Sequence, residues 1–463
     1  MSVSDTIFAL ATPPGRSAIA IIRISGIGAH DVLSHFGVPG TQVLDKPVAQ
    51  YRRLKADSGQ IIDDVMLVLF PSSASPTGEN ITEIQCHGSP AVVQFLLSEL
   101  ADIPGLRPAQ PGEFSRRSFN NGKMGLVDLE GLADLIDAQT TLQHQQAMNV
   151  MTGKLSAQLL IYKEQLVSIL SRLEAIIDFS DEDLPDDVLD EYENIITELQ
   201  NNIKVLVSDS ELSEQIRDGV KIALIGPVNA GKSTILNVLA KREVAIVSEI
   251  EGTTRDVIEV RLDLGGIPVI LTDTAGIREA EDFVEIEGIK RAKKVAAEAD
   301  VIILVLDVSN PDWAELLGEF EKWGSAIKLV VLNKADLLSD NAIQQKINHV
   351  NTPILEHAEP IIASFQNQNT ENSGDILVKK LADILSYIPT SSSDLRLTRS
   401  WHKSACLSVS VALERALALD IQQQPELVAE ELRYACVSLG RLTGTVDAED
   451  LLDNIFSNFC IGK

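Results

Sequence analysis

The stretch GPVNAGKS, at residues 226–233, has the residue types and spacing that phosphate groups require. It follows the apolar run KIALI and precedes the helix-favouring run STILNVLAKR, which predicts a strand, a loop and a helix in that order. The glycines allow backbone N–H groups to face phosphate oxygens at a helix N-terminus. Lys232 offers a positive charge to the β- and γ-phosphates, and Ser233 offers a hydroxyl to Mg²⁺. This pattern predicts a nucleoside triphosphate site.

Three further motifs follow in the order that such a site needs. EGTTRD (251–256) offers Thr254 as a second hydroxyl ligand of Mg²⁺, and DTAG (273–276) ends an apolar strand with Asp273 behind the metal. NKAD (333–336) ends another strand, and Asp336 can accept both N–H groups on the Watson–Crick edge of guanine. Adenine lacks the 2-amino donor for that paired contact. We therefore expect GTP rather than ATP.

The residue that orients the attacking water is left open by the motifs. GTPases of the Ras type place a glutamine directly after D-x-x-G, but this chain has Ile277 there, and its side chain cannot hydrogen-bond to water. The carboxylates of Glu279, Glu281, Glu285 and Glu287 follow on the same segment. The motif chemistry does not choose among them.

Length, composition and charge limit the class of protein. A chain of 463 residues with 45% apolar residues predicts two to four globular domains, and no run reaches the roughly 20 apolar residues of a membrane span. The N-terminus has no signal-peptide pattern, so we expect a cytoplasmic protein. The net charge of −28 argues against a broad nonspecific surface for nucleic acid. An RNA partner would need a local basic patch or a partner protein.

The pattern of apolar residues changes three times along the chain. Residues 1–120 predict a mixed α/β domain, and residues 121–218 predict a helical segment whose second helix covers residues 189–219. Residues 219–385 alternate buried strands with helices, and residues 386–463 return to helix. The predicted fold is multi-domain, α/β plus all-α: a helical domain interrupted by an inserted Ras-like P-loop G domain with a mostly parallel sheet.

With these motifs identified, the chain resembles the tRNA-modification GTPases of the MnmE/TrmE family over essentially its whole length. The resemblance rests on DTIFALATPPGRSAIAIIRISG near the start, TGENITEIQCHGSP, PGEFSRRSFNNGKMGLVDLEGLADLIDA, the GTPase motifs, and FCIGK at the end. The generic GTPase motifs do not separate this family from its relatives, but the first, third and last stretches do.

The resemblance implies a fold and a function. It implies a folate-binding N-terminal domain, a homodimer formed through the N-terminal domains, and the flavoprotein partner MnmG/GidA. Together such proteins add a carboxymethylaminomethyl-type group to carbon 5 of the wobble uridine of certain tRNAs. The one-carbon unit comes from a tetrahydrofolate derivative, in the methylene form; the 5-formyl form is an expected ligand. The alternative is a GTP-dependent switch or ribosome-assembly GTPase without one-carbon chemistry.

In the G domain the resemblance assigns ion and water contacts. Asn229, Ser248, Ile250 and Thr253 are similar to the K⁺ ligands of the family, while Ser233 and Thr254 remain the expected Mg²⁺ ligands. Glu285 is similar to the glutamate that positions the water, as a catalytic residue. The residues expected to line the GTP site are Asn229, Ala230, Gly231, Lys232, Ser233, Thr234, Ser248, Glu249, Ile250, Glu251, Gly252, Thr253, Thr254, Asp273, Thr274, Ala275, Gly276, Asn333, Lys334, Ala335, Asp336 and Ser364.

Three positions depart from the family pattern, and one of them is Ser89, because HGSP replaces HGGP at residues 87–90. Phe365 replaces a small residue in the guanine-contacting loop beside Ser364, and Glu251 stands where a small residue is usual in the potassium loop.

For the folate, the resemblance implies contacts from four residues. Arg23, Glu83, Lys123 and the terminal Lys463 match family positions that contact the pterin or its tail. The chemistry is reasonable, because a carboxylate pairs with the donor edge of a pterin and cations suit a glutamate tail.

The cysteines and one histidine carry their own alternatives. Cys86, Cys406 and Cys436 are expected to be buried apolar residues. Cys460 stands fourth from the end, the place of a prenylated cysteine, but Gly-Lys at the end suits prenylation poorly. A buried thiol remains open; the family match favours a catalytic or accessory thiol near the folate. His87 could be a general base beside Cys86, but a packed turn histidine is favoured.

Overall fold

The computed structural model describes residues 5–39, 44–178, 186–241, 258–273, 293–315, 317, 327–348, 360–365, 370–388, 397–444 and 462. The chain divides into two compact units. Unit 1 comprises residues 1–133, 150–204 and 404–463, and unit 2 comprises residues 134–149 and 205–403.

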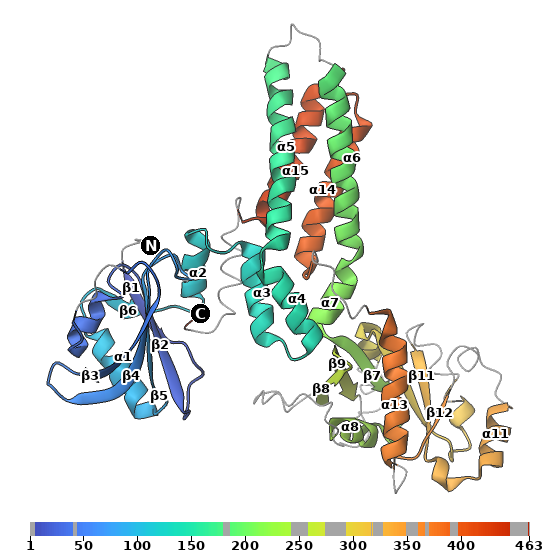
Figure 1. Ribbon diagram of the computed structural model, residues 1–463. Helices are drawn as coiled ribbons and strands as arrows, with labels where there is room; N and C mark the ends of the chain where they lie inside the picture. The colour runs from blue at the N-terminus through green and yellow to red at the C-terminus, as the bar shows by residue number, and fades with distance from the viewer. Residues whose placement is uncertain are drawn as a thin grey trace, which may run out of the picture. The chain divides into compact units, whose positions relative to one another are not determined.

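Unit 1 begins with a six-stranded sheet of order β3-β4-β5-β2-β1-β6 (Figure 1). Neighbouring strands are antiparallel except β1 and β6, which run parallel. The strands are β1 (Thr6–Leu10), β2 (Ile19–Ser25), β3 (Val48–Lys55), β4 (Ile61–Phe70), β5 (Ile81–His87) and β6 (Leu106–Pro108). A 3₁₀ helix, η1 (Asp31–Phe36), and the α-helix α1 (Pro90–Ala101) complete this part of the unit.

The two faces of this sheet differ in what covers them. Alternate residues such as Ile22, Leu67 and Ile84 point to one face and form a core with Leu96 of α1. On the other face, Phe114 of α2 (Glu113–Asn120) packs on β1, in a small cluster with Ile7 and Ala9. Apolar side chains of β2, β3 and β4 stay exposed, namely Ile19, Tyr51, Ile61 and Met66.

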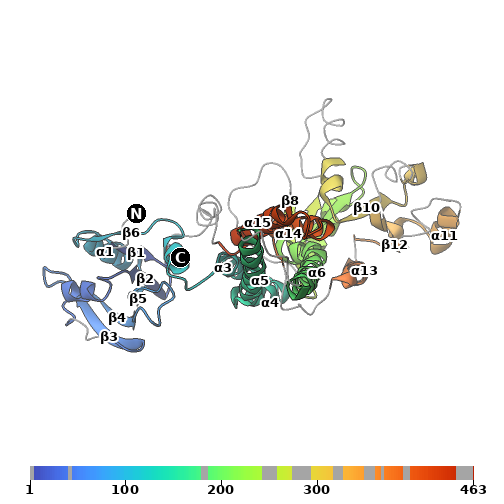
Figure 2. The ribbon, with the colours of Figure 1, turned by 90° about the horizontal axis from the view of Figure 1, so that it is seen from above.

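Long helices make up the rest of unit 1. The helices α5, α6, α14 and α15 run side by side in both views (Figures 1 and 2). Buried residues recur at steps of three and four: in α5 they are Leu155, Leu159, Tyr162, Leu166, Ile169 and Leu173. This heptad-like spacing keeps one apolar face along each helix, which is the pattern of a helical bundle. The bounds are α3 (Leu126–Asp137), α5 (Lys154–Asp178), α6 (Asp186–Ser208), α14 (Ser400–Ala418) and α15 (Pro425–Leu442), and α3, α6 and α14 each continue into unit 2.

Unit 2 contains a second six-stranded sheet, of order β12-β11-β10-β7-β9-β8. All neighbours are parallel except the β8–β9 hairpin. The strands are β7 (Val220–Ile225), β8 (Ile258–Leu264), β9 (Ile267–Asp273), β10 (Val301–Asp307), β11 (Ile327–Asn333) and β12 (Ile361–Ile362). Apolar clusters cover both faces, so the central strands read as continuous apolar runs. The predicted fold class is confirmed.

Helices cover the second sheet, and two of them precede the inserted strands in sequence. Leu142 of α4 and Ile216 of α7 belong to the same core as β7 and β9. The described helices of this unit include α4 (Thr141–Met151), α7 (Ser210–Asp218), α8 (Lys232–Ala240), α11 (Asp340–Asn348) and α13 (Thr370–Ile384), with 3₁₀ turns η2 (Ala335–Leu337) and η3 (Leu385–Tyr387). Within the described ranges, no helix is long and apolar enough to cross a bilayer.

One predicted helix is wrong, because residues 189–219 do not form a single helix. The structure ends α6 at Ser208 and starts α7 at Ser210. Ser208 Oγ donates to Val205 O at 2.8 Å, and the buried Ser210 Oγ donates to Val207 O at 2.7 Å. Serine hydroxyls that bond the preceding turn compete with the helical ladder, which favours a break here.

Buried His30 predicts a pH dependence of stability in unit 1. Its Nδ1 lies 3.0 Å from Thr82 Oγ1, which donates to Ala29 O at 2.7 Å, so Nδ1 carries the proton and Nε2 is buried without a hydrogen bond in the described chain. Burial lowers the pKa of His30, against the opposing charge of Asp31. The unfolded chain therefore takes up the proton first, and the free energy of unfolding falls as the pH drops below about 6.5.

We expect His30→Asn, which keeps a polar group near Thr82 but cannot titrate, to flatten this loss in thermal melts of the full chain between pH 7.5 and pH 5.5. His35→Asn is the matched control, since His35 is exposed on the same segment. Identical pH profiles for the wild type and His30→Asn would contradict the prediction.

Candidate functional site

The carboxyl ends of four parallel strands meet at one edge of the unit 2 sheet. Gly226 follows β7, and Asp273, Asp307 and Asn333 end β9, β10 and β11. Asp273 and Asn333 are buried although both are polar. In open parallel sheets this edge is where ligands bind, because the strands deliver their following loops to one place.

The loop from 226 to 231 approaches its neighbours closely. Gly226 and Gly231 have positive φ, and a Cβ on either would collide with Val305 O or Asn333 Nδ2 respectively. Asn229 also has a positive φ of 62°, which asparagine tolerates better than most residues. Asn333 Nδ2 donates to the backbone oxygen of Ala230 at 2.8 Å. The end of β11 thus holds the glycine loop in place.

The cation and hydroxyl of the glycine loop lie at the N-terminus of α8. Lys232 Nζ donates to Gly226 O and Pro227 O, both at 2.8 Å. Burial lowers the pKa of Lys232, while the nearby charge of Asp273 raises it. Ser233 Oγ donates to Asp273 Oδ2 at 2.6 Å, so a hydroxyl and a carboxylate lie together. Oxygen atoms of these two kinds suit Mg²⁺.

The NKAD segment is built around two side-chain pairs. Lys334, with φ of 61°, places Nζ 2.7 Å from Asp307 Oδ2. Burial raises the pKa of Asp307, but the hydrogen bonds from Lys334 and Ser309 outweigh it and lower the pKa. Ser364 Oγ donates to Asp336 Oδ1 at 2.6 Å. Asp336 is thereby oriented by the loop that was predicted to contact guanine.

The structure brings most of the described GTP candidates together, and some lie outside its description. In the phosphate loop, Ala230 accepts from Asn333 and Ser233 donates to Asp273, and Thr234 follows on α8. The backbone N–H of Ala335 donates to Ala363 O at 3.1 Å, next to Ser364. The residues outside the described ranges are Ser248, Glu249, Ile250, Glu251, Gly252, Thr253, Thr254, Thr274, Ala275, Gly276 and Glu285, with Cys460 and Lys463 in the tail. Their roles stay predictions.

In unit 1, Arg23 and Glu83 face each other across β2 and β5. They are register partners, and Arg23 Nη2 and Nε lie 2.8 and 3.0 Å from Glu83 Oε1. The Arg23 guanidinium also lies 5.8 Å from the ring centroid of Phe114 and donates to Gly462 O at 3.3 Å. A Cβ on Gly462 would collide with Leu10 O. Gly462 therefore lies beside β1 and β2 of the sheet.

Within the described residues, Lys123 makes no hydrogen bond or ion pair with Arg23 or Glu83. Its Nζ donates to Ser73 O at 3.3 Å, in the β4–β5 connection. The structure therefore brings together two of the three described folate candidates.

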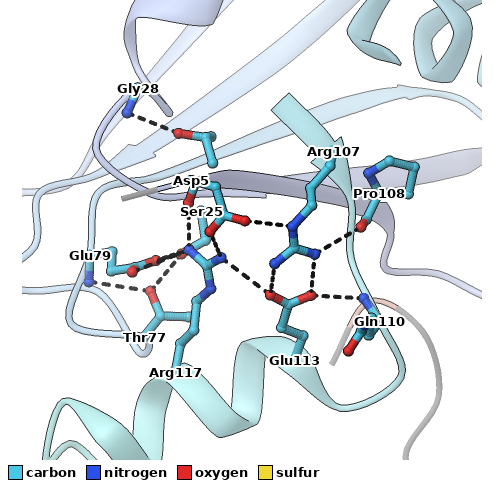
Figure 3. A network of polar contacts seen from close by, with 11 residues as sticks. Asp5, Ser25, Gly28, Thr77, Glu79, Arg107, Pro108, Gln110, Glu113 and Arg117 are labelled. Atoms are coloured by element: carbon cyan, nitrogen blue, oxygen red, sulfur yellow. Dashed lines mark hydrogen bonds and ion pairs between the residues drawn. The ribbon is translucent and has the colours of Figure 1, made fainter. Parts of the chain in front are cut away.

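A polar network holds α2 against the strands that carry Arg23 and Glu83 (Figure 3). Arg117 of α2 bonds to Glu79, just before β5, and Glu79 accepts from Ser25 at the end of β2. Burial raises the pKa of Glu113, but Arg107 and other donors outweigh it and lower the pKa, so the carboxylate stays charged. The network fixes the helix that carries Phe114 relative to Arg23.

The cysteine prediction is confirmed for the described residues, and the histidine prediction is wrong. Cys86, Cys406 and Cys436 are buried, and burial raises their thiol pKa values to about 11, 12 and 11. His87 is exposed rather than packed, with Nδ1 2.8 Å from Asp63 Oδ1. His87 is the last residue of β5, and Asp63 Oδ2 also accepts its backbone N–H at 2.8 Å.

Sequence reasoning missed Asp307 and Ser373. Asp307 ends the apolar strand VIILVLD, so its place at the carboxyl edge of the sheet was a usable signal. Ser373 Oγ donates to Ser364 O at 3.1 Å and accepts from its N–H at 3.2 Å. Nothing in the motifs pointed to that contact, because α13 follows the guanine loop without a signature.

Comparisons with known proteins cover the whole chain. Residues 126–460 match the family described as MnmE helical domain, and residues 6–123 match the GTP-binding protein TrmE N-terminus. The tRNA modification GTPase MnmE of Paramagnetospirillum magneticum is 41% identical over 464 residues, covering 100% of both chains. The protein of the same name from Cereibacter sphaeroides is 42% identical, covering 99% of this chain and 100% of its own.

Among solved structures, a variant of Aquifex aeolicus Era bound to GDP and AlF₄⁻ is 26% identical, with a TM-score of 0.29. It covers 43% of this chain and 67% of its own.

The Asp336 carboxylate predicts base selectivity. Asp336→Asn replaces one acceptor with an N–H donor, so we expect GTP affinity to fall at least about tenfold and xanthosine triphosphate, which has a carbonyl oxygen at that edge, to gain affinity. Competition binding with both nucleotides measures this. Asp340→Asn on α11 is the control. Unchanged GTP affinity in Asp336→Asn would remove this carboxylate from base recognition.

Proposed function

The chain belongs to the tRNA modification GTPase MnmE family, and from that premise we propose that it controls one-carbon transfer to a tRNA wobble uridine by GTP hydrolysis. GTP hydrolysis in tRNA modification is the activity of this family by name. The finer chemistry proposed is addition of a carboxymethylaminomethyl-type group at carbon 5, with the flavoprotein MnmG/GidA. The one-carbon unit is carried by methylene-tetrahydrofolate.

The observation that supports the folate part is the Arg23–Glu83 pair on the face of the sheet where Phe114 of α2 packs. The Glu83 carboxylate is largely buried and accepts two guanidinium N–H groups of Arg23, and a carboxylate can also accept from the donor edge of a pterin. Phe114 offers an apolar surface beside it. Gly462 O already lies at Arg23, which supports Lys463 and Cys460 as contributors to the same pocket.

The nucleotide part of the proposal assigns roles along the sheet edge. Lys232 and the loop N–H groups bind the phosphates, Ser233 and Thr254 ligate Mg²⁺, and Asp336 reads guanine. Asn229, with Ser248, Ile250 and Thr253, would hold K⁺, which supplies positive charge to the transition state as paired G domains close. Glu285 would orient the attacking water.

Exposed apolar side chains on the first sheet support a homodimer. Ile19, Tyr51, Ile61 and Met66 are exposed on β2, β3 and β4, and covering them fits a homodimer formed through the N-terminal domains. We also propose that the protein is cytoplasmic.

The proposed domains cover residues 1–120, 121–218, 219–385 and 386–463. The family matches over residues 6–123 and 126–460 support the first boundary.

The folate proposal predicts saturable binding of 5-formyl-tetrahydrofolate. Isothermal titration of the full chain should give saturable heat, and Arg23→Ala should weaken binding at least about tenfold, because Glu83 loses its charge partner. Arg53→Ala is the matched control, since Arg53 also pairs with a carboxylate, Asp64, on the same sheet. Absence of heat with the wild type would support the alternative, a GTPase switch or ribosome-assembly factor without one-carbon chemistry.

The potassium proposal predicts an ion dependence of hydrolysis. GTP turnover should be clearly faster in KCl than in NaCl at equal ionic strength, because the proposed loop is matched to the larger ion. Asn229→Ala should remove the difference while GTP still binds. Equal rates in the two salts would remove K⁺ from the mechanism.

A further inference from the structure

One side chain of α13, that of Ser373, holds the backbone of the loop that follows β12. Its Oγ accepts from the N–H of Ser364 at 3.2 Å and donates to the backbone oxygen of Ser364 at 3.1 Å. Both serines are buried, with 7% of each residue exposed. A hydroxyl that bonds both backbone groups of one residue supplies the partners that a neighbouring strand would otherwise supply. The backbone of Ser364 is therefore held by α13.

The buried face of α13 fixes this helix against the second sheet. Leu377 and Leu381 belong to the same apolar core as Phe365, the residue that follows Ser364. Ser373 precedes Leu377 by four residues, so it lies on the same face of the helix, one turn earlier. The helix and the loop are thus packed in one core, and the Ser373 hydroxyl joins them at the point where the loop leaves the sheet.

The side chain of Ser364 passes this constraint to the NKAD segment. Ser364 Oγ donates to Asp336 Oδ1 at 2.6 Å, and hydroxyl bonds to a carboxylate are among the stronger hydrogen bonds of proteins. Asp336 is exposed, so burial does not restrict the rotation of its carboxylate. A donor that is itself held in place gives the carboxylate a preferred orientation.

We propose that Ser373 is a positioning residue for guanine recognition, which acts through Ser364 on Asp336. This rests on the proposed role of Asp336 as the acceptor of two guanine N–H groups. A carboxylate that bonds two N–H groups at once must have one orientation, and ordering it only when the base binds would cost affinity. Ser373 supplies that order in advance, although none of the nucleotide motifs contains it.

The test is a double-mutant cycle in the full chain, with GDP affinity as the measurement. A carboxylate in the binding orientation only about a tenth of the time binds guanine about tenfold more weakly, so we expect a loss approaching that in Ser373→Ala. Asp336→Asn alone should weaken GDP binding at least about tenfold. The double variant should bind GDP within about threefold of Asp336→Asn, because the carboxylate that Ser373 positions is already gone.

Inosine diphosphate separates base recognition from a general loosening of unit 2. It carries the same diphosphate but lacks the 2-amino group, so the ratio of GDP affinity to inosine diphosphate affinity reports the second N–H contact. We expect this ratio to be smaller in Ser373→Ala than in the wild type. Alanine favours a helix more than serine does, so α13 should be retained. Ser373→Cys, which fills similar space but is a weak hydrogen-bonding partner, should change the ratio in the same direction.

The control variant is Asn372→Ala, an exposed position in the same turn of α13. It should bind both nucleotides as the wild type does. An unchanged affinity ratio in Ser373→Ala, or additive losses in the double variant, overturns the proposal while the role of Asp336 stands. If Asp336→Asn by itself leaves GDP affinity unchanged, the role of Asp336 fails and this proposal fails with it.

Discussion

One buried amide, that of Asn333, holds the nucleotide edge of unit 2 together. Its Nδ2 donates to Ala230 O, and its Oδ1 accepts from the backbone N–H groups of Lys334 and Phe365 at 2.8 and 3.4 Å. Three loops that are distant in sequence therefore share one side chain. Because Asn333 is buried, losing it would leave those groups unpaired away from water, at a cost of about 1–3 kcal/mol for each group. The same contact requires glycine at position 231, because a Cβ there would collide with Asn333 Nδ2.

The contacts at this edge give Lys232 and Lys334 different roles, although both were GTP-site candidates from the sequence. Lys334 forms an ion pair with Asp307, so its role is to hold the ends of β10 and β11 together. Lys232 bonds only to backbone oxygens in the described chain, and burial already lowers its pKa. A phosphate at this place would raise that pKa again, because it adds negative charge beside the buried ammonium. Binding of an anionic ligand is therefore favoured, because it offsets the desolvation of the Lys232 ammonium in the folded protein.

The sequence predicted the parts of the site that depend on strand ends. Asp273, Asn333 and Asp336 follow apolar runs, and parallel strands bring such positions to one edge. It failed where tertiary contacts decide. The break between α6 and α7 depends on buried serine hydroxyls, and no motif places Lys123 against Ser73.

The folate candidates were predicted from the family resemblance, because residue chemistry alone does not pair Arg23 with Glu83. Arg23 and Glu83 lie 60 residues apart, and only strand register shows that they are opposite each other.

Charge is divided unevenly between the parts of the chain, and this bears on where RNA can approach. Residues 1–123 hold ten Lys and Arg against eleven Asp and Glu, so almost all of the net charge of −28 lies in the remainder. A polyanion is repelled least by the N-terminal part, where Arg52 and Lys55 lie exposed on the edge strand β3. The acid-rich remainder favours cations instead, which is the charge that the proposed Mg²⁺ and K⁺ sites require. The distribution of net charge therefore favours the first 123 residues over the rest of the chain as the part that a polyanion approaches.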